Sequence, residues 1–211
     1  MNEERKEILY ERIGTPERGE ETSEVGKMEI ETLGQTLELK SSALNVARAI
    51  YQRAVQNRTI VENCRVVDLA VCSVYLACRI EQLGFDPVAV SKESMISQYT
   101  LKKIFPLVKQ ELDLEIGPVD PENHVQRYCE NLGLSEAVEE TAIEIIEATK
   151  DDVLSGRSPS GFAASAVYAS SLLQNEKRTQ RQVSRHTGVS ARTIRDTYQL
   201  QIHTMGIADR N

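Results

Sequence analysis

Apolar residues recur at steps of three and four along most of this chain, the spacing that places them on one face of an α-helix. Leu, Ile, Val and Ala supply most of these positions, and no stretch alternates as a half-buried strand does. We therefore predict an all-α fold. The expected helices cover, in chain order, residues 24–34, 41–57, 66–83, 88–96, 100–114, 121–131, 135–153, 159–174, 180–186 and 191–203.

Residues that favour helix starts support several of these boundaries. Ser158 precedes Pro159, which places a capping side chain before proline at the first helical position. Thr179 with Gln182 fits a capping box, and Ser190 can cap the last helix.

The helical pattern occurs twice. The segment LAVCSVYLA from Leu69 and the segment FAASAVYAS from Phe162 keep the same order of apolar and small residues, and each is apolar on most faces, as expected of a central helix. Two sister five-helix domains are the simplest account. We expect an acidic flexible segment at 1–26, a first repeat at 27–115, a helix-breaking linker at 116–120 and a second repeat at 121–206.

Charge is unevenly distributed. The formal net charge is -7, so the chain is not a uniformly basic nucleic-acid binder. Residues 1–31 are acidic, whereas residues 174–203 carry six bases against two acids. This basic segment is compatible with DNA binding. An acidic surface suited to a salty cytoplasm remains the alternative explanation of the overall charge.

The cysteines and histidines form no zinc pattern, so we expect no metal, no cofactor and reduced thiols buried in helices. No signal peptide opens the sequence, and the apolar run from Phe162 to Leu173 is too short to cross a bilayer. We expect a cytoplasmic protein, or a nuclear one in a eukaryote. The four cysteines are Cys64, Cys72, Cys78 and Cys129.

The stretch QVSRHTGVSARTIRDTYQ, near the carboxyl end, has the spacing of a helix-turn-helix. Gly188 can supply the left-handed turn, Ser184 is small enough for the helices to touch, and Ile194 fills the wedge between them. We expect Tyr198 and Ile202, which follow Ile194 in steps of four, to complete the inward face.

Arg192, Arg195 and Gln199 lie together on another face of the same helix. Two arginines there can enter the major groove and contact guanine, or bind phosphates. Ser190 and Thr193, at the start of the helix, belong to the same predicted DNA-binding set. The alternative is a solvated basic face on a structural helix.

Two motifs carry a family resemblance. The run SGRSPSGFAASAVY, residues 155–168, resembles the GR-x-P-x-G-x-A-A-A-A-x-Y signature of the second cyclin repeat in transcription factor IIB and its archaeal homologue. The helix-turn-helix resembles the final one of that family, and VVDLAVCSVYLACR is similar to the central helix of its first repeat. The resemblance covers roughly residues 27–206 and implies two tandem cyclin-like domains.

The resemblance also implies a function. In this family the core binds the complex of TATA-binding protein with promoter DNA, and the last helix reads the B recognition element in the major groove. The family's two base-contacting positions match Arg192 and Arg195. The predicted phosphate contacts are Arg157, Arg178, Arg181 and Arg185.

The sequence departs from the family in two places. The family usually begins with a zinc ribbon that recruits RNA polymerase, and none is found here, so a complete chain would be a variant that binds promoters without direct recruitment. A shortened chain would leave this point open. Pro106 is expected to interrupt and kink a helix of the first repeat, at about 3 kcal/mol. The first helix-turn-helix also lacks a turn glycine, so we expect altered contacts of the first repeat with TATA-binding protein.

A cyclin-like module that docks on a partner protein without DNA is the competing hypothesis. An enzyme is disfavoured, because no nucleophile elbow, phosphate-binding loop or zinc motif occurs.

Overall fold

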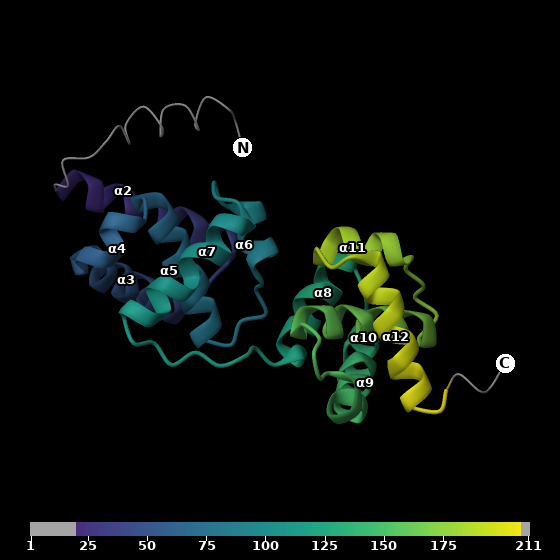
Figure 1. Cartoon of the computed structure of the whole chain (residues 1–211). Helices are drawn as coiled ribbons and strands as arrows, with labels where there is room; N and C mark the ends of the chain where they lie inside the picture. Colours follow the sequence, from purple (N-terminus) through teal and green to yellow (C-terminus); the bar gives the residue numbers. More distant parts are fainter. Residues whose placement is uncertain (1–19, 208–211) are drawn as a thin grey trace. The chain divides into compact units, whose positions relative to one another are not determined.

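Helices are the only regular elements among residues 20–207, the part of the chain that the computed structural model describes. The all-α prediction is confirmed. The chain divides into two compact units (Figure 1), the first reaching Glu81 and continuing over Pro87–Ile116, the second comprising Gln82–Asp86 and the chain from Gly117 on. No helix in the described part is long and apolar enough to cross a membrane.

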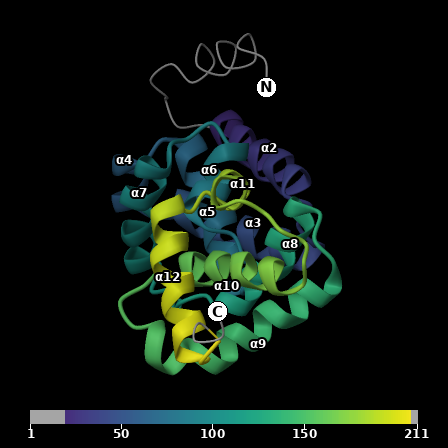
Figure 2. The same cartoon turned by 90° about the vertical axis from the view of Figure 1, so that its right-hand side faces the viewer.

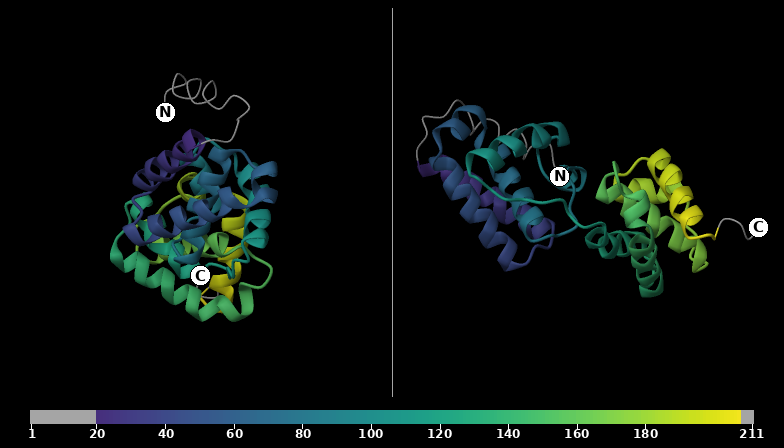
Figure 3. Two further views of the ribbon diagram at one scale, coloured as in Figure 1. Left: turned by 90° about the vertical axis from the view of Figure 1, so that its left-hand side faces the viewer. Right: turned by 60° about the horizontal axis from the view of Figure 1, so that its bottom comes forward.

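The first unit surrounds one buried helix, α5. Its residues from Val67 to Cys78 are all buried, as the apolar sequence predicted. Helices α2, α3 and α7 pack against it, and the right-hand view of Figure 3 shows α2 (purple) beside α3 (blue). The helices of this unit are α2 Glu20–Thr36, α3 Ser41–Gln56, α4 Arg58–Asn63, α5 Val66–Ile80, α6 Pro87–Glu93 and α7 Gln98–Glu111.

Helix α2 begins earlier than expected. It starts at Glu20, so α2 includes residues 20–26 of the segment 1–26 that the sequence predicts to be flexible. A Cβ at Gly26 would lie 2.0 Å from the Tyr51 hydroxyl, and the Tyr51 side chain is fully buried. Close packing against α3 therefore holds this turn in helix. Residues 1–19 lie outside the described part.

The prediction that Pro106 interrupts its helix is wrong, since α7 is helical from Gln98 to Glu111. Proline removes the N–H that would bond the carbonyl of Lys102. Leu101, Ile104 and Val108 on the same helix are buried, so packing against the unit outweighs the lost bond.

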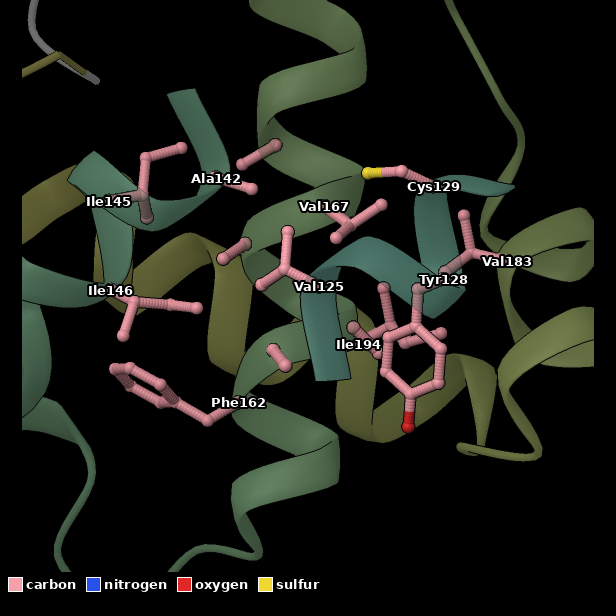
Figure 4. Close-up of a cluster of buried hydrophobic side chains, with 14 of the residues drawn as sticks. Val125, Tyr128, Cys129, Ala142, Ile145, Ile146, Phe162, Val167, Val183 and Ile194 are labelled. Carbon is pink, nitrogen blue, oxygen red and sulfur yellow. The ribbon is translucent and has the colours of Figure 1, made fainter. Parts of the chain in front are cut away.

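The second unit is built on α10 in the same way. Residues Gly161–Val167 of α10 are all buried, and α9 and α12 pack on it (Figures 1 and 2). Figure 4 shows Phe162 close to Ile146 of α9, within the core of this unit. Its helices are the 3-10 helix Pro121–His124, α8 Val125–Leu132, α9 Glu136–Val153, α10 Pro159–Leu173, α11 Gln180–Thr187 and α12 Ala191–Thr204.

The segment Gln82–Asp86 belongs to the second unit although it lies between helices of the first. The carbonyl oxygen of Gly84 accepts hydrogen bonds from Arg127 Nη2 (2.6 Å) and from Nδ1 of the buried His124 (2.7 Å). Because a carbonyl can only accept, the His124 proton on this side sits on Nδ1. The Arg127 guanidinium also lies 4.9 Å from the Phe85 ring centroid. The segment is thus anchored by a charged group and a cation–π contact.

We expect Gly84→Ala to destabilise the second unit by about 1–3 kcal/mol through overpacking. An added Cβ would lie 2.0 Å from the backbone oxygen of Asn123, which cannot move as a side chain can. Thermal unfolding measures the loss. Gly117→Ala is the matched control, because a Cβ there meets nothing within 4 Å. An equal melting temperature for the two variants would contradict the prediction.

Candidate nucleic-acid interface

The helix-turn-helix is defined by three local signals in the sequence. Thr179 and Gln182 form the predicted capping box at the start of α11. Gly188 ends α11 in the left-handed region (φ 75°), and its N–H donates to the Ser184 carbonyl (3.0 Å). Ser190 then caps α12, with its Oγ accepting from the Thr193 N–H (3.0 Å). The predicted turn geometry is confirmed.

The predicted inward residues of α12 all pack against the core of the unit, and two further residues of the helix are buried beside them. Ile194, Thr197 and Gln201 are its buried residues, whereas Tyr198 and Ile202 are only partly buried. Steps of three and four alternate because 3.6 residues complete a turn, so strict steps of four drift off the face. The buried Gln201 amide donates to the Phe162 carbonyl (3.2 Å) and ties α12 to α10.

A glycine on α10 allows α12 to approach closely. A Cβ at Gly161 would lie 2.7 Å from Ser158 Oγ and 3.2 Å from Thr193 Cγ2. The ring of Tyr168 on α10 also meets that of Tyr198 edge-on, with centroids 4.9 Å apart. These contacts fix the orientation of α12 against the core of the unit.

The predicted base-reading arginines lie on the exposed face of α12. The side chain of Arg192 is 84% exposed and that of Arg195 is 53% exposed, and Gln199 is exposed as well. Both guanidiniums contact one carboxylate: Arg192 Nε donates to Asp196 Oδ2 (3.4 Å) and Arg195 Nε to Asp196 Oδ1 (3.2 Å). Exposed pairs of this kind contribute only about 0–1 kcal/mol, so the arginines can be redirected to another acceptor.

The remaining predicted residues differ in whether their side chains are already bonded within the chain. Arg181 and Arg185 on α11 are exposed and accessible to a phosphate. Ser190 and Thr193 are engaged with each other, their hydroxyls 2.8 Å apart, so their first role is capping. Arg157, although exposed, donates to the Val153 carbonyl at the end of α9.

Comparison with known proteins decides the family. The transcription factor TFIIB repeat matches this chain twice, at residues 20–111 and 115–204. The chain belongs to the TFIIB repeat family. The predicted resemblance and the tandem cyclin-like repeats are confirmed.

Three similar proteins from archaea are relatives of this chain. Transcription initiation factor IIB 7 of Halobacterium salinarum is 39% identical over 93% of this chain and 61% of its own length. Factor IIB 3 of the same organism is 40% identical over 98% of this chain and 64% of its own length. Transcription initiation factor IIB of Archaeoglobus fulgidus is 31% identical over 85% and 55%. The chain therefore spans about three fifths of the length of these relatives.

A viral cyclin from herpesvirus saimiri is a distant structural neighbour. It aligns with a TM-score of 0.42 and 12% sequence identity, covering 92% of this chain and 87% of its own.

In this TFIIB-repeat chain, Arg178 has a structural role that the phosphate prediction missed. Its Nη2 donates to the carbonyls of Leu132 and Gly133 (both 2.9 Å), and its Nη1 donates to that of Glu176 (3.0 Å). The Glu176 carboxylate accepts from the hydroxyl and N–H of Ser135, and these bonds lower the pKa of Glu176. These hydrogen bonds therefore hold the segment between α10 and α11 against the turn between α8 and α9.

We expect Arg178→Ala to destabilise the second unit by about 1–3 kcal/mol, the usual range for hydrogen bonds to a charged group. The backbone carbonyls that now accept from Arg178 would lose these hydrogen bonds, and water would replace them only in part. Urea unfolding provides the measurement, with the exposed Lys177→Ala as control. Equal unfolding midpoints for the two variants would restore Arg178 to the phosphate-binding candidates.

Asp196 is the site residue that sequence reasoning missed. It follows Arg192 by four residues, a spacing at which opposite charges meet on a helix. It is also the sole acidic residue between Lys177 and Ile207. Those two facts were available from the sequence alone.

Proposed function

We propose that this chain is a IIB-type initiation factor that binds the complex of TATA-binding protein with promoter DNA. In this proposal α12 enters the major groove upstream of the TATA box and reads the B recognition element. The observation that carries it is the exposed pair Arg192 and Arg195, on a helix whose opposite face is buried through Ile194. Relatives named transcription initiation factor IIB support it.

The chemistry of the exposed face suits this role. An arginine can donate two parallel hydrogen bonds to guanine O6 and N7, which discriminates by about 1–3 kcal/mol against other bases. Arg181 and Arg185, exposed on α11, can neutralise backbone phosphates beside the groove. With a net charge of -7, binding must depend on this local basic surface and not on the chain as a whole.

A gel-shift assay tests the proposal. The chain is titrated onto a TATA-containing duplex with and without TATA-binding protein, over a salt series. We expect a further shift when TATA-binding protein is present, and its affinity should fall steeply as salt rises because phosphate contacts release counterions. Selection from a random pool, with TATA-binding protein present, then identifies the preferred upstream sequence.

The absence of a gel shift would contradict the proposal. No shift with any duplex, at any salt concentration and with TATA-binding protein present, would exclude promoter binding. It would favour the competing hypothesis of a cyclin-like module that docks on a protein partner.

A further inference from the structure

The exposed face of α12 carries one acidic residue, whose negative charge is unfavourable for binding to DNA. Asp196 accepts from the Nε of both Arg192 and Arg195, at 3.4 and 3.2 Å. Its own side chain is 51% exposed. From Lys177 to Ile207 the chain holds six arginines and lysines and this single acid. A carboxylate thus contacts both arginines within an otherwise basic segment of the chain.

Helix stability does not account for this carboxylate. Exposed ion pairs contribute about 0–1 kcal/mol. Asp196 is the sixth residue of α12, beyond the first turn in which the helix dipole favours an acid. Aspartate is also a poor helix former in the interior of a helix. Its position is better explained by what the two arginines do.

The donor atoms indicate a positioning effect. In both contacts the arginine donates through Nε, and the terminal Nη groups take no part. A guanidinium held at Nε loses rotational freedom yet keeps Nη donors for a second acceptor. The carboxylate can therefore hold both side chains while they remain able to contact a base edge.

The two kinds of hydrogen-bond acceptor in DNA, backbone phosphates and base edges, differ in charge. A phosphate carries a full negative charge and is repelled by a carboxylate, whereas guanine O6 and N7 are neutral acceptors. The same carboxylate thus penalises a backbone contact more than a base contact. Removing its charge would raise the net charge of this cluster from +1 to +2.

We propose that Asp196 is a specificity-determining positioning residue: it holds Arg192 and Arg195 for base contact and suppresses their binding to phosphates. This inference rests on the proposed promoter binding. It assigns discrimination between DNA sequences to a residue that makes no base contact of its own.

Two substitutions separate the parts of this role. Asp196→Asn keeps an acceptor oxygen and removes the charge, whereas Asp196→Ala removes both. Binding is measured with TATA-binding protein on the duplex selected by the wild-type chain, and on the same duplex with its upstream flank shuffled. We expect the asparagine variant to bind the shuffled duplex more tightly, with a salt slope steeper by about one. For the asparagine variant, the ratio of the affinity for the selected duplex to that for the shuffled duplex should fall roughly five- to tenfold. For the alanine variant this ratio should fall further, toward the value expected when one bidentate base contact is lost.

Asp151→Asn is the matched control, because it makes the same charge change at an exposed position on α9. Its affinity ratio should equal that of the wild type. Circular dichroism verifies that all variants keep their helices. An affinity ratio within about twofold of wild type, together with an unchanged salt slope, in both Asp196 variants would overturn the inference. A loss confined to the alanine variant would overturn the repulsion of phosphates and retain the positioning effect. Failure of the wild-type chain to bind any duplex would refute the promoter-binding proposal itself, and this inference with it.

Discussion

Phe162→Ala is expected to lower the stability of the second unit by about 3–5 kcal/mol, the range for truncating a buried aromatic ring. The Phe162 side chain is fully buried in the core around α10 (Figure 4). Its removal loses the transfer free energy of the ring and leaves a cavity that small neighbours such as Ala163 and Ala166 cannot fill. Urea unfolding followed by circular dichroism measures the change. Because a domain has about 5–15 kcal/mol of stability in total, the proposed DNA binding should weaken through partial unfolding.

Leu173→Ala provides the control from the same helix. Leu173 is 43% exposed, and surface substitutions usually change stability by less than about 0.5 kcal/mol. A loss of less than about 1 kcal/mol for Phe162→Ala would mean that α10 is not the centre of the core.

Local sequence signals were sufficient to predict most of the fold. The apolar residues of α5 and α10 left no polar face, which required that other helices surround them. Ser158 and Thr179 marked helix starts, because their side chains can accept the backbone N–H groups that a helix leaves unpaired, and both do so. Where local preference and packing agreed, the predicted boundaries lay within a few residues of the observed ones.

The missed features depend on tertiary contacts. The short helix α4 has six residues and is too short to show a periodic pattern, although Asn57 caps it through Ile60 N–H (3.1 Å). The helix around Pro106 persists because its apolar face is buried. Neither outcome can be derived from the properties of the segment alone.

The sequence was sufficient to predict the backbone of the helix-turn-helix, but not the hydrogen-bond partners of its side chains. Gly188 and Ser190 defined the turn, since a left-handed residue and a cap are required there. The partners of Arg178 are carbonyls in Leu132 and Gly133, more than forty residues earlier in the chain. Only the packed unit brings them together, so this structural role of a predicted phosphate contact could not be derived from the sequence.

Arg195→Ala is expected to lower the ratio of affinities for selected and shuffled promoter duplexes by about five- to 150-fold, which corresponds to the 1–3 kcal/mol of one bidentate base contact. Its side chain is 53% exposed, and Ile194, the neighbouring residue that packs into the core, is unchanged. The helical fold should therefore persist. Gel shifts with TATA-binding protein on both duplexes give the ratio, and circular dichroism verifies the helices.

Arg181→Ala distinguishes base reading from general attraction to DNA. Arg181 is exposed on α11, where we expect it to contact phosphate. Its loss should weaken binding to both duplexes equally and make the salt slope shallower by about one, with the ratio unchanged. If Arg195→Ala gave this same uniform effect, α12 would lie on the phosphate backbone, and the specificity of the proposed complex would have to come from TATA-binding protein alone. A lowered ratio for Arg195→Ala beside an unchanged ratio for Arg181→Ala is the result that a recognition helix in the major groove requires.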